Sequence, residues 1–190
     1  MQTPQAIIDF WFSRDAERYW FHANVDFDAT IARRFGDLLH AARNDRLNQW
    51  EETPLGALAL IIVLDQFPRN IYRGKARCYD LDPLARRVAR DAIERHFDDA
   101  LSPAQKTFLY LPFMHSENLD DQNYSVELCH NAGLSNLEFA EDHREIIKRF
   151  GRFPHRNALL KRINTQEEDN YLASGHAFTG GQVAHEYDDI

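Results

Sequence analysis

Residues 53–65 read TPLGALALIIVLD and are typical of a helix inside a protein core. Thr53 offers a side-chain oxygen that can cap the first free N–H groups, and Pro54 suits the first helical position. The apolar run that follows, from Leu55 to Leu64, is about half as long as a segment that spans a bilayer. We therefore expect a buried helix here and not a membrane anchor.

The same start signals recur along the chain and predict further helices. A capping residue followed by proline, or the spacing of a capping box, occurs at Thr3-Pro4, Asp82-Pro83, Ser102-Pro103, Ser102…Gln105, Ser135…Glu138 and Thr165…Glu168. Between these signals apolar residues recur every three or four positions, and no alternating strand or Asn-Gly hairpin turn stands out. We predict helices near residues 4–13, 27–44, 54–66, 83–98, 103–111, 117–131, 136–150 and 166–173.

The predicted architecture is all-α, with about eight helices in a single domain. The connections between the predicted helices are short, so neighbouring helices are expected to pack as antiparallel pairs. A length of 190 residues suits one domain with a sizeable core. We assign residues 1–173 to this helical domain and residues 174–190, which include Gly180-Gly181, to a loosely ordered C-terminal tail.

The charge balance and the cysteine content narrow the partners and the compartment. The chain has 22 basic and 30 acidic side chains and a formal net charge of −8, whereas nucleic acids and anionic membranes attract positive surfaces. Cys78 and Cys129 form neither a metal-binding pattern nor a disulfide framework, and no export signal is visible, so we expect a cytoplasmic protein. No glycine-rich phosphate loop is present, and no cofactor is predicted.

A short motif occurs twice in the chain. The first Phe-Pro motif is Phe67-Pro68-Arg69-Asn70, and the second Phe-Pro motif is Phe153-Pro154-His155-Arg156-Asn157, with one residue inserted. Because proline disfavours helix for the residue before it, we expect a helix to end at each motif. Further arginines lie close by in the sequence, namely Arg73, Arg77 and Arg152.

These arginines allow two interpretations. The planar guanidinium suits bidentate capture of a carboxylate or phosphate, which predicts an anion pocket where the two motifs meet. Alternatively, the arginines cap the carboxyl ends of helices and pair with local carboxylates such as Asp65, four residues before Arg69.

Residues 111–122, LPFMHSENLDDQ, contain a second polar cluster, which we expect to follow a turn that contains proline. His115 could act as an acid or a base, with Glu117 orienting it. Alternatively, Ser116 caps a helix and the acidic residues complement the helix dipole, which leaves His115 a partly buried turn residue. A metal-assisted hydrolase built on these residues with His143 and His155 is a further possibility. The spacing matches no standard ligand pattern, so we predict no metal ligand.

Several of these segments resemble a largely bacterial family known as domain of unknown function 924. The matching runs are VLDQFPRNIYRG (63–74), LPFMHSE (111–117), FGRFPHRN (150–157) and TQEE (165–168), and the resemblance extends from about Ile8 to about Leu172. It implies a tetratricopeptide-like array of stacked antiparallel helix pairs with a concave face, and no particular reaction. Because the family's characteristic motifs are polar and lie in loops, the resemblance favours a binding role for these residues.

The leading functional hypothesis is a pocket for a small anionic metabolite or a peptide carboxylate. The predicted ligand-binding residues are Asp65, Arg69, Arg73, Arg77, Gln122, Arg152, His155 and Arg156, and the catalytic candidates are His115 and Glu117. The alternative is a protein- or peptide-interaction scaffold of the tetratricopeptide type, because stacked helix pairs commonly bind peptides on a concave face. Both an enzyme and a binding protein are compatible with this pattern, in any oligomeric state.

Overall fold

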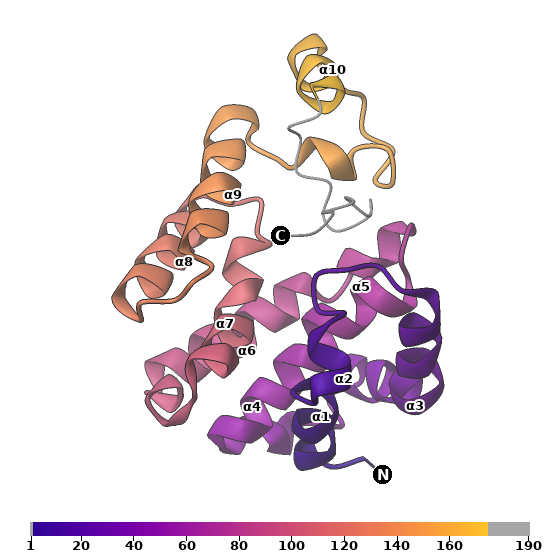
Figure 1. The fold of residues 1–190 in the computed structure, drawn as a ribbon, viewed down its shortest axis with the longest axis vertical. Coiled ribbons are helices and arrows are strands. Elements are labelled where there is room, and N and C mark those ends of the chain that lie inside the picture. Colours follow the sequence, from indigo (N-terminus) through magenta and orange to yellow (C-terminus); the bar gives the residue numbers. More distant parts are fainter. Residues whose placement is uncertain (1, 175–190) are drawn as a thin grey trace.

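The regular elements of the described chain are all helical. The computed structural model describes residues 2–174, so the predicted C-terminal tail, apart from Ser174, lies outside the described residues. The α-helices, shown in Figure 1, are α1 (Pro4–Trp11), α2 (Arg14–Glu17), α3 (Val25–Arg43), α4 (Pro54–Ile61), α5 (Phe67–Ile71), α6 (Asp82–Glu94), α7 (Pro103–Met114), α8 (Leu119–Asn131), α9 (Leu137–Phe150) and α10 (Gln166–Ala173). The predicted all-α fold class is confirmed.

Five shorter segments connect these helices. A π-helical segment, η2 (Ile62–Gln66), joins α4 to α5. The others are 3-10 turns, namely η1 (Asn48–Glu52), η3 (Ala76–Tyr79), η4 (Phe97–Ala100) and η5 (Pro154–Arg156).

Helix α4 and segment η2 run through the middle of the core. Every residue from Ala57 to Leu64 is at most 3% exposed, as the unbroken apolar run predicts. Helix α4 packs against α1, α6, α7 and η1. Gly56 permits the close approach of η1, because a Cβ atom at this position would collide with the backbone carbonyl of Trp50. The expected buried helix is therefore confirmed.

Neighbouring helices pack in pairs. Helix α8 contacts both α7 and α9, and the α8–α9 pair forms one flank of the molecule in Figure 1, opposite α3. The main hydrophobic core extends from Ile7 to Ala140. Ile146, Ile147 and Phe153 form a second, smaller cluster, against which side chains of α9 and α10 pack. The last part of the described chain is thus held together partly by a cluster of its own.

Two expected helix ends are wrong, both at prolines. The helix continues through the first Phe-Pro motif, because the N–H of Phe67 donates to the carbonyl of Ile62, five residues back, and Pro68 has no N–H to place. The wider turn of η2 thus admits the proline without ending the helix. Likewise Pro112 lies inside α7, which continues to Met114, so the polar cluster at residues 111–122 does not follow a proline-containing turn.

The predicted helix caps are confirmed at several starts and wrong at two. The side chains of Thr3, Thr53, Ser102 and Thr165 cap α1, α4, α7 and α10, and the last two form complete capping boxes. Ser135 forms no box, because Asn136 is the N-cap residue of α9. Asp82 is the first residue of α6 and not its cap, and its carboxylate binds Arg69.

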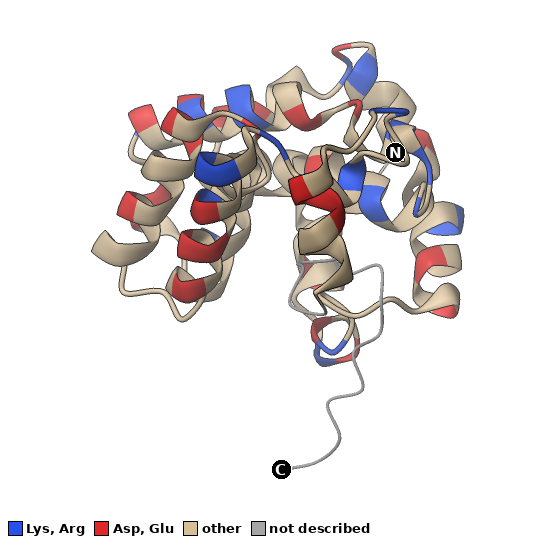
Figure 2. Ribbon diagram, turned by 90° about the horizontal axis from the view of Figure 1, so that it is seen from above, with Lys and Arg blue, Asp and Glu red and all other residues tan. Residues whose placement is uncertain are grey.

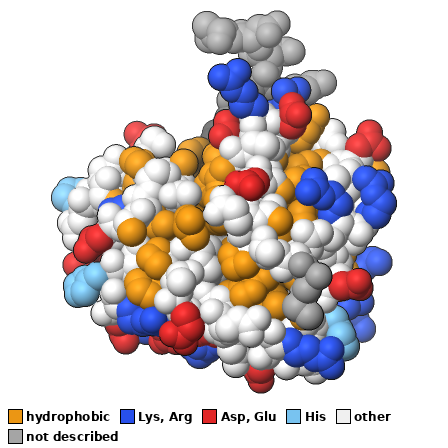
Figure 3. Space-filling model, turned by 90° about the horizontal axis from the view of Figure 1, so that it is seen from below, with side chains coloured by type: hydrophobic (Ala, Val, Ile, Leu, Met, Phe, Trp, Pro, Cys, Tyr) orange, Lys and Arg blue, Asp and Glu red, His pale blue; other side chains and the backbone are white. Residues whose placement is uncertain are grey.

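The surface mixes charges and gathers apolar side chains on one face. Seen from above, basic and acidic residues are interspersed along the ribbon (Figure 2). Seen from below, hydrophobic side chains gather near the centre of the face, and charged ones lie around its edge (Figure 3). None of the helices within residues 2–174 is long and apolar enough to cross a membrane.

Candidate functional site

Asp65 in η2 is the centre of a buried polar cluster. Its side chain is 1% exposed, its Oδ1 lies 2.8 Å from Nδ1 of His115, and its Oδ2 accepts a hydrogen bond of 2.6 Å from Gln66. Burial raises the pKa of Asp65, but the charges of Arg69 and His115 and these hydrogen bonds outweigh it and hold the pKa well below its usual value. Asp65 is therefore an ionised carboxylate, which only accepts hydrogen bonds.

His115 is held through one ring nitrogen and accessible at the other side of the ring. It follows the last residue of α7, and its side chain is 16% exposed. Because the Asp65 carboxylate only accepts, Nδ1 carries the proton and Nε2 has a free lone pair. Nε2 has no hydrogen-bond partner among residues 2–174. Burial and the charge of Arg69 lower the pKa of His115, so the ring is neutral near pH 7.

Arg69 connects Asp65 to Asp82. Its two terminal nitrogens donate to the two carboxylate oxygens of Asp82, both at 2.9 Å. Nη1 also donates to the backbone carbonyl of Asp65 at 2.6 Å and lies 3.2 Å from its Oδ1. Burial lowers the pKa of Arg69, but the charges of the two carboxylates outweigh this effect and raise the pKa above its usual value. The guanidinium therefore stays charged. This bidentate pairing makes Arg69 a structural cation.

Arg156 has no such partner. Its side chain is 9% exposed, and its guanidinium carbon lies 4.6 Å from the ring centre of Tyr79 and 4.4 Å from that of Phe153. Nη1 is 4.0 Å from Oδ2 of Asp82, too far for a hydrogen bond. Nε is fully enclosed and has no hydrogen-bond partner in the described chain, whereas Nη1 and Nη2 are not among the enclosed atoms. Burial and the charge of Arg69 lower the pKa of Arg156.

The two Phe-Pro motifs meet at Asp82, at the start of α6. Arg69 of the first motif binds this carboxylate directly, and Arg156 of the second motif approaches its Oδ2 to 4.0 Å. The two arginines are therefore neighbours in space, as an anion pocket between the motifs requires. The anion between them is the carboxylate of Asp82, a residue of the same chain and not a ligand.

Two further histidines border Arg156. The rings of His143 in α9 and His155 in η5 lie 5.6 and 5.5 Å from the ring of Phe153. Burial, with the charges of His115 and Arg156, lowers the pKa of His143 to about 3. Burial, with the charge of Arg156 and of the other histidines, lowers the pKa of His155 to about 3. Arg156 is thus a cation beside histidines that are neutral at pH 7.

Comparison with known proteins gives the family. Residues 7–176 match a family described as bacterial protein of unknown function, DUF924. The chain belongs to this family. It is also similar to the solved structure of a protein of unknown function from Agrobacterium tumefaciens, with 44% sequence identity, a TM-score of 0.86, and coverage of 90% of this chain and 96% of that one. No curated protein matches the chain. The resemblance inferred from the motifs is confirmed, and the matches name no reaction.

Two arginines of this DUF924 protein that were predicted to bind a ligand pair with carboxylates of the chain itself. Arg73 donates two hydrogen bonds to Asp28, at 2.7 and 3.0 Å. Arg152 donates two to Glu168, at 2.6 and 2.7 Å. Charge pairing of this kind was the alternative interpretation of the arginines, although both partners lie far away in the sequence. Arg73 and Arg152 therefore connect segments of the chain through these ion pairs.

Glu117 and Gln122 also have structural partners in the DUF924 fold. Glu117 accepts two hydrogen bonds from Arg162, at 2.7 and 2.9 Å, and one of 2.8 Å from the backbone N–H of Phe153. It therefore binds the second Phe-Pro motif and does not orient His115, whose partner is Asp65. Gln122 is fully buried, and its side-chain amide donates a hydrogen bond of 2.7 Å to the backbone carbonyl of Met114, the last residue of α7.

Two residues of the site carry no clear local signal in the sequence. Asp82 has the position of a helix cap before proline, and Tyr79 has no neighbouring motif. Their partners come from other segments, so no spacing rule indicates them. Within residues 2–174 no group of three or more His, Cys, Asp or Glu side chains could hold a metal ion. Burial raises the pKa of the nearby Cys78 thiol, which disfavours a thiolate nucleophile.

Proposed function

We propose that this protein binds a small anion, a carboxylate or a phosphate, at the guanidinium of Arg156. The observation that carries the proposal is a buried arginine whose Nε has no acceptor in the described chain and whose Nη1 comes no nearer than 4.0 Å to a carboxylate oxygen. Leaving a buried donor unsatisfied costs about 1–3 kcal/mol, and more when the group is charged. Such groups are rare in native structures, and one explanation for them is an ion that binds there. Nη1 and Nη2 are not enclosed in the same way, and an anion at these two atoms would supply acceptors to them and the missing charge.

The surroundings of Arg156 favour an anion over a neutral ligand. Asp82 is the carboxylate nearest to it, and both of its oxygens already accept from Arg69. The rings of Tyr79 and Phe153 contact the guanidinium, so that it is fixed in orientation before a ligand arrives. The neighbouring histidines add no negative charge that would compete with the ligand.

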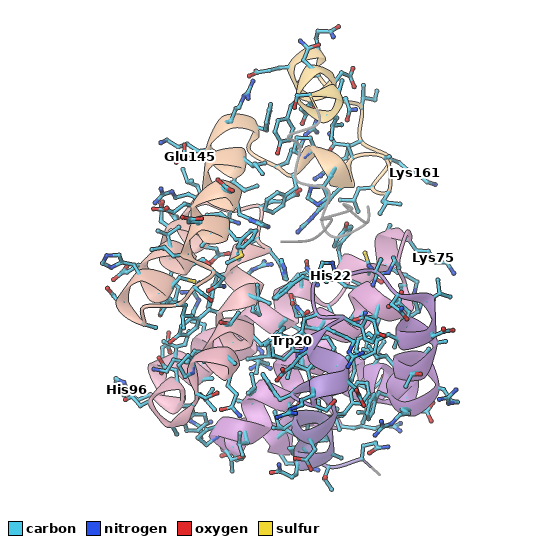
Figure 4. All side chains as sticks on the ribbon, in the orientation of Figure 1. Trp20, His22, Lys75, His96, Glu145 and Lys161 are labelled. Carbon is cyan, nitrogen blue, oxygen red and sulfur yellow. The ribbon has the colours of Figure 1, made fainter. Side chains whose placement is uncertain are left out.

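Exposed basic side chains follow each of the two motifs in the sequence. Lys75, in the turn before η3, and Lys161, in the loop after η5, both project outward on the same side of the molecule in Figure 4. Arg77 is exposed as well and stacks on Tyr72, with 3.8 Å from its guanidinium carbon to the ring centre. In a chain with a net charge of −8, such local positive charge supports the attraction of an anion.

We also infer that this binding takes place in the cytoplasm. Cys78 and Cys129 are free thiols, and both are buried. Unpaired cysteines are usual in proteins of a reducing compartment.

Replacing Arg156 by methionine tests the proposed function. The probes are inorganic phosphate and acetate, each compared with potassium chloride at equal ionic strength, and the readout is the melting temperature. A ligand at ~100 times its dissociation constant stabilises the folded protein by about 2.7 kcal/mol. Phosphate also stabilises proteins by exclusion from their surface, so the informative quantity is the difference between wild type and variant. We expect an anion-dependent rise that Arg156→Met lacks.

Arg149→Gln is the matched control. Arg149 is an exposed arginine at the end of α9 that pairs with Glu167 at 2.8 Å, away from Asp82. This variant should keep the wild-type response to both probes. An equal response of wild type and Arg156→Met to both probes would refute anion binding at Arg156.

A further inference from the structure

We infer that an anion held by Arg156 also donates a hydrogen bond to Nε2 of His115, so that the site selects oxyanions that carry an O–H group. This inference rests on the proposed function and names the class of ligand for the same site. Hydrogen phosphate and 2-hydroxycarboxylates combine negative charge with an O–H donor. Sulfate and simple carboxylates at neutral pH carry the charge alone.

The tautomer of His115 is fixed by its partner. Nδ1 lies 2.8 Å from a carboxylate that also accepts from Gln66 and lies 3.2 Å from Arg69. These donors keep Asp65 ionised, so the proton between the two groups belongs to Nδ1. Nε2 is then an acceptor and cannot donate.

The accessible part of the His115 ring is the part that contains Nε2. The side chain of His115 is 16% exposed, whereas that of its partner Asp65 is 1% exposed. Nδ1 is bound to this enclosed carboxylate, whereas Nε2 is not among the enclosed polar atoms of the described chain and is open to a ligand. His143 differs, since it is 4% exposed and its Nδ1 is bound to the backbone carbonyl of Phe139 in its own helix. Of these two histidines, His115 is the one placed to meet a ligand.

His115 and Arg156 border the same buried cluster, which consists of Asp65, Arg69 and Asp82. A series of contacts links them, with 2.8 Å from His115 to Asp65, 3.2 Å from Asp65 to Arg69, 2.9 Å from Arg69 to Asp82 and 4.0 Å from Asp82 to Arg156. The two groups also have common neighbours, because charge on either His115 or Arg156 lowers the pKa of both His143 and His155.

Selection follows from the opposite requirements of these two groups. Arg156 offers donors, which any oxyanion satisfies, whereas Nε2 of His115 offers a lone pair, which only an O–H or N–H group satisfies. An anion without a proton would place an oxygen lone pair against the lone pair of Nε2. Leaving this acceptor unpaired reduces affinity, and repulsion reduces it further.

Isothermal titration calorimetry with two pairs of anions tests the inference on the full chain at pH 7 and constant ionic strength. The first pair is phosphate and sulfate, and the second is lactate and propionate. Because one hydrogen bond is worth roughly a tenfold ratio of dissociation constants, the member of each pair that carries an O–H group should bind roughly tenfold more tightly. A preference for phosphate alone identifies hydrogen phosphate or its esters as the ligand class, and a preference for lactate identifies 2-hydroxycarboxylates.

Two substitutions distinguish the tautomer argument from general effects on affinity. In Asp65→Asn the amide can donate to Nδ1, which moves the proton to Nε2, so the preference within the pair should disappear or reverse. His115→Leu should reduce the ratio to about one while Arg156 still binds both anions. Exposed His130 in α8 provides the control, and His130→Gln should keep the wild-type ratio.

The outcomes separate this inference from the proposed function. Binding of both members of each pair with equal affinity overturns the selection by His115 and leaves anion binding at Arg156 standing. Absence of binding for all four anions overturns both. If Asp65→Asn does not fold, His115→Leu and the ¹⁵N chemical shifts of His115 remain as tests. A proton found on Nε2 in the wild-type protein also overturns the inference.

Discussion

Arg69 and Arg156 approach the same carboxylate but contribute differently to the folded protein. Arg69 donates to both oxygens of Asp82 at 2.9 Å, so its buried charge is compensated. Arg156 reaches that carboxylate only at 4.0 Å, and its Nε is enclosed without a partner in the described chain. A buried charge with a good partner is close to neutral for stability, whereas an uncompensated one is destabilising. Removing the two side chains should therefore have opposite effects.

In the absence of added anions, we expect Arg156→Met to raise the free energy of unfolding by about 1–3 kcal/mol. The substitution removes an unsatisfied buried cation and leaves apolar atoms beside Tyr79 and Phe153. Arg69→Met should lower the free energy of unfolding by about 3–5 kcal/mol, because it leaves Asp65 and Asp82 without their cation. Urea denaturation followed by circular dichroism measures both. A clear loss of stability in Arg156→Met would show that its charge is compensated.

Some contacts of the candidate site follow from spacing in the sequence, but most of the partners that its residues bind do not. Asp65 and Arg69 are four residues apart, and this spacing correctly indicates a contact. His115 and Glu117 are also close in the chain, yet one binds Asp65 and the other Arg162. These contacts join segments that are distant in the sequence, and they depend on how the helices pack.

Among the elements, the long helices were predictable and the irregular segments were not. Helices with a side-chain cap and an apolar stripe, such as α4 and α10, begin where their signals predict. The π turn of η2 has no sequence signal of that kind. It lets Pro68 remain inside a helix. This exception matters for the site, because η2 carries Asp65 and α5 carries Arg69.

The capping signals provide a test at this scale. Ser102 accepts from the N–H of Gln105 at 3.3 Å, and the Gln105 side chain accepts from the N–H of Ser102 at 2.9 Å. Ser135 has the same spacing to Glu138 but caps nothing, because α9 begins after Asn136. We expect Ser102→Ala to lower the free energy of unfolding by about 1 kcal/mol, and Ser135→Ala to change it by less than about 0.5 kcal/mol. Equal losses in urea denaturation would contradict the cap assignment.

At the scale of the whole molecule, the candidate site lies where two parts of the chain meet. Asp65, Asp82 and His115 belong to elements of the main core, whereas His143 and Arg156 lie beside the smaller cluster around Phe153. The connections near the site are largely polar, as in the hydrogen bonds of Glu117 to Arg162 and to the backbone of Phe153. Polar groups buried at such a junction make its packing sensitive to their protonation.

His143 should make the stability of the molecule depend on pH. Its ring packs on Phe153, and burial with the charges of His115 and Arg156 lowers its pKa from the usual 6.5 to about 3. Because the folded state keeps this ring neutral, the unfolded state binds the extra proton below pH 6.5, and stability falls as pH falls from there toward 3. The loss from this group is on the order of 2 kcal/mol at pH 5.

The variant His143→Phe should be less stable than the wild type at pH 8, because it lacks the hydrogen bond to Phe139. Its free energy of unfolding should nevertheless fall less between pH 8 and pH 5 than that of the wild type. Urea denaturation at both pH values measures the difference, with His130→Gln as the exposed control. Equal falls in wild type and His143→Phe would show that this histidine is not held neutral in the folded protein.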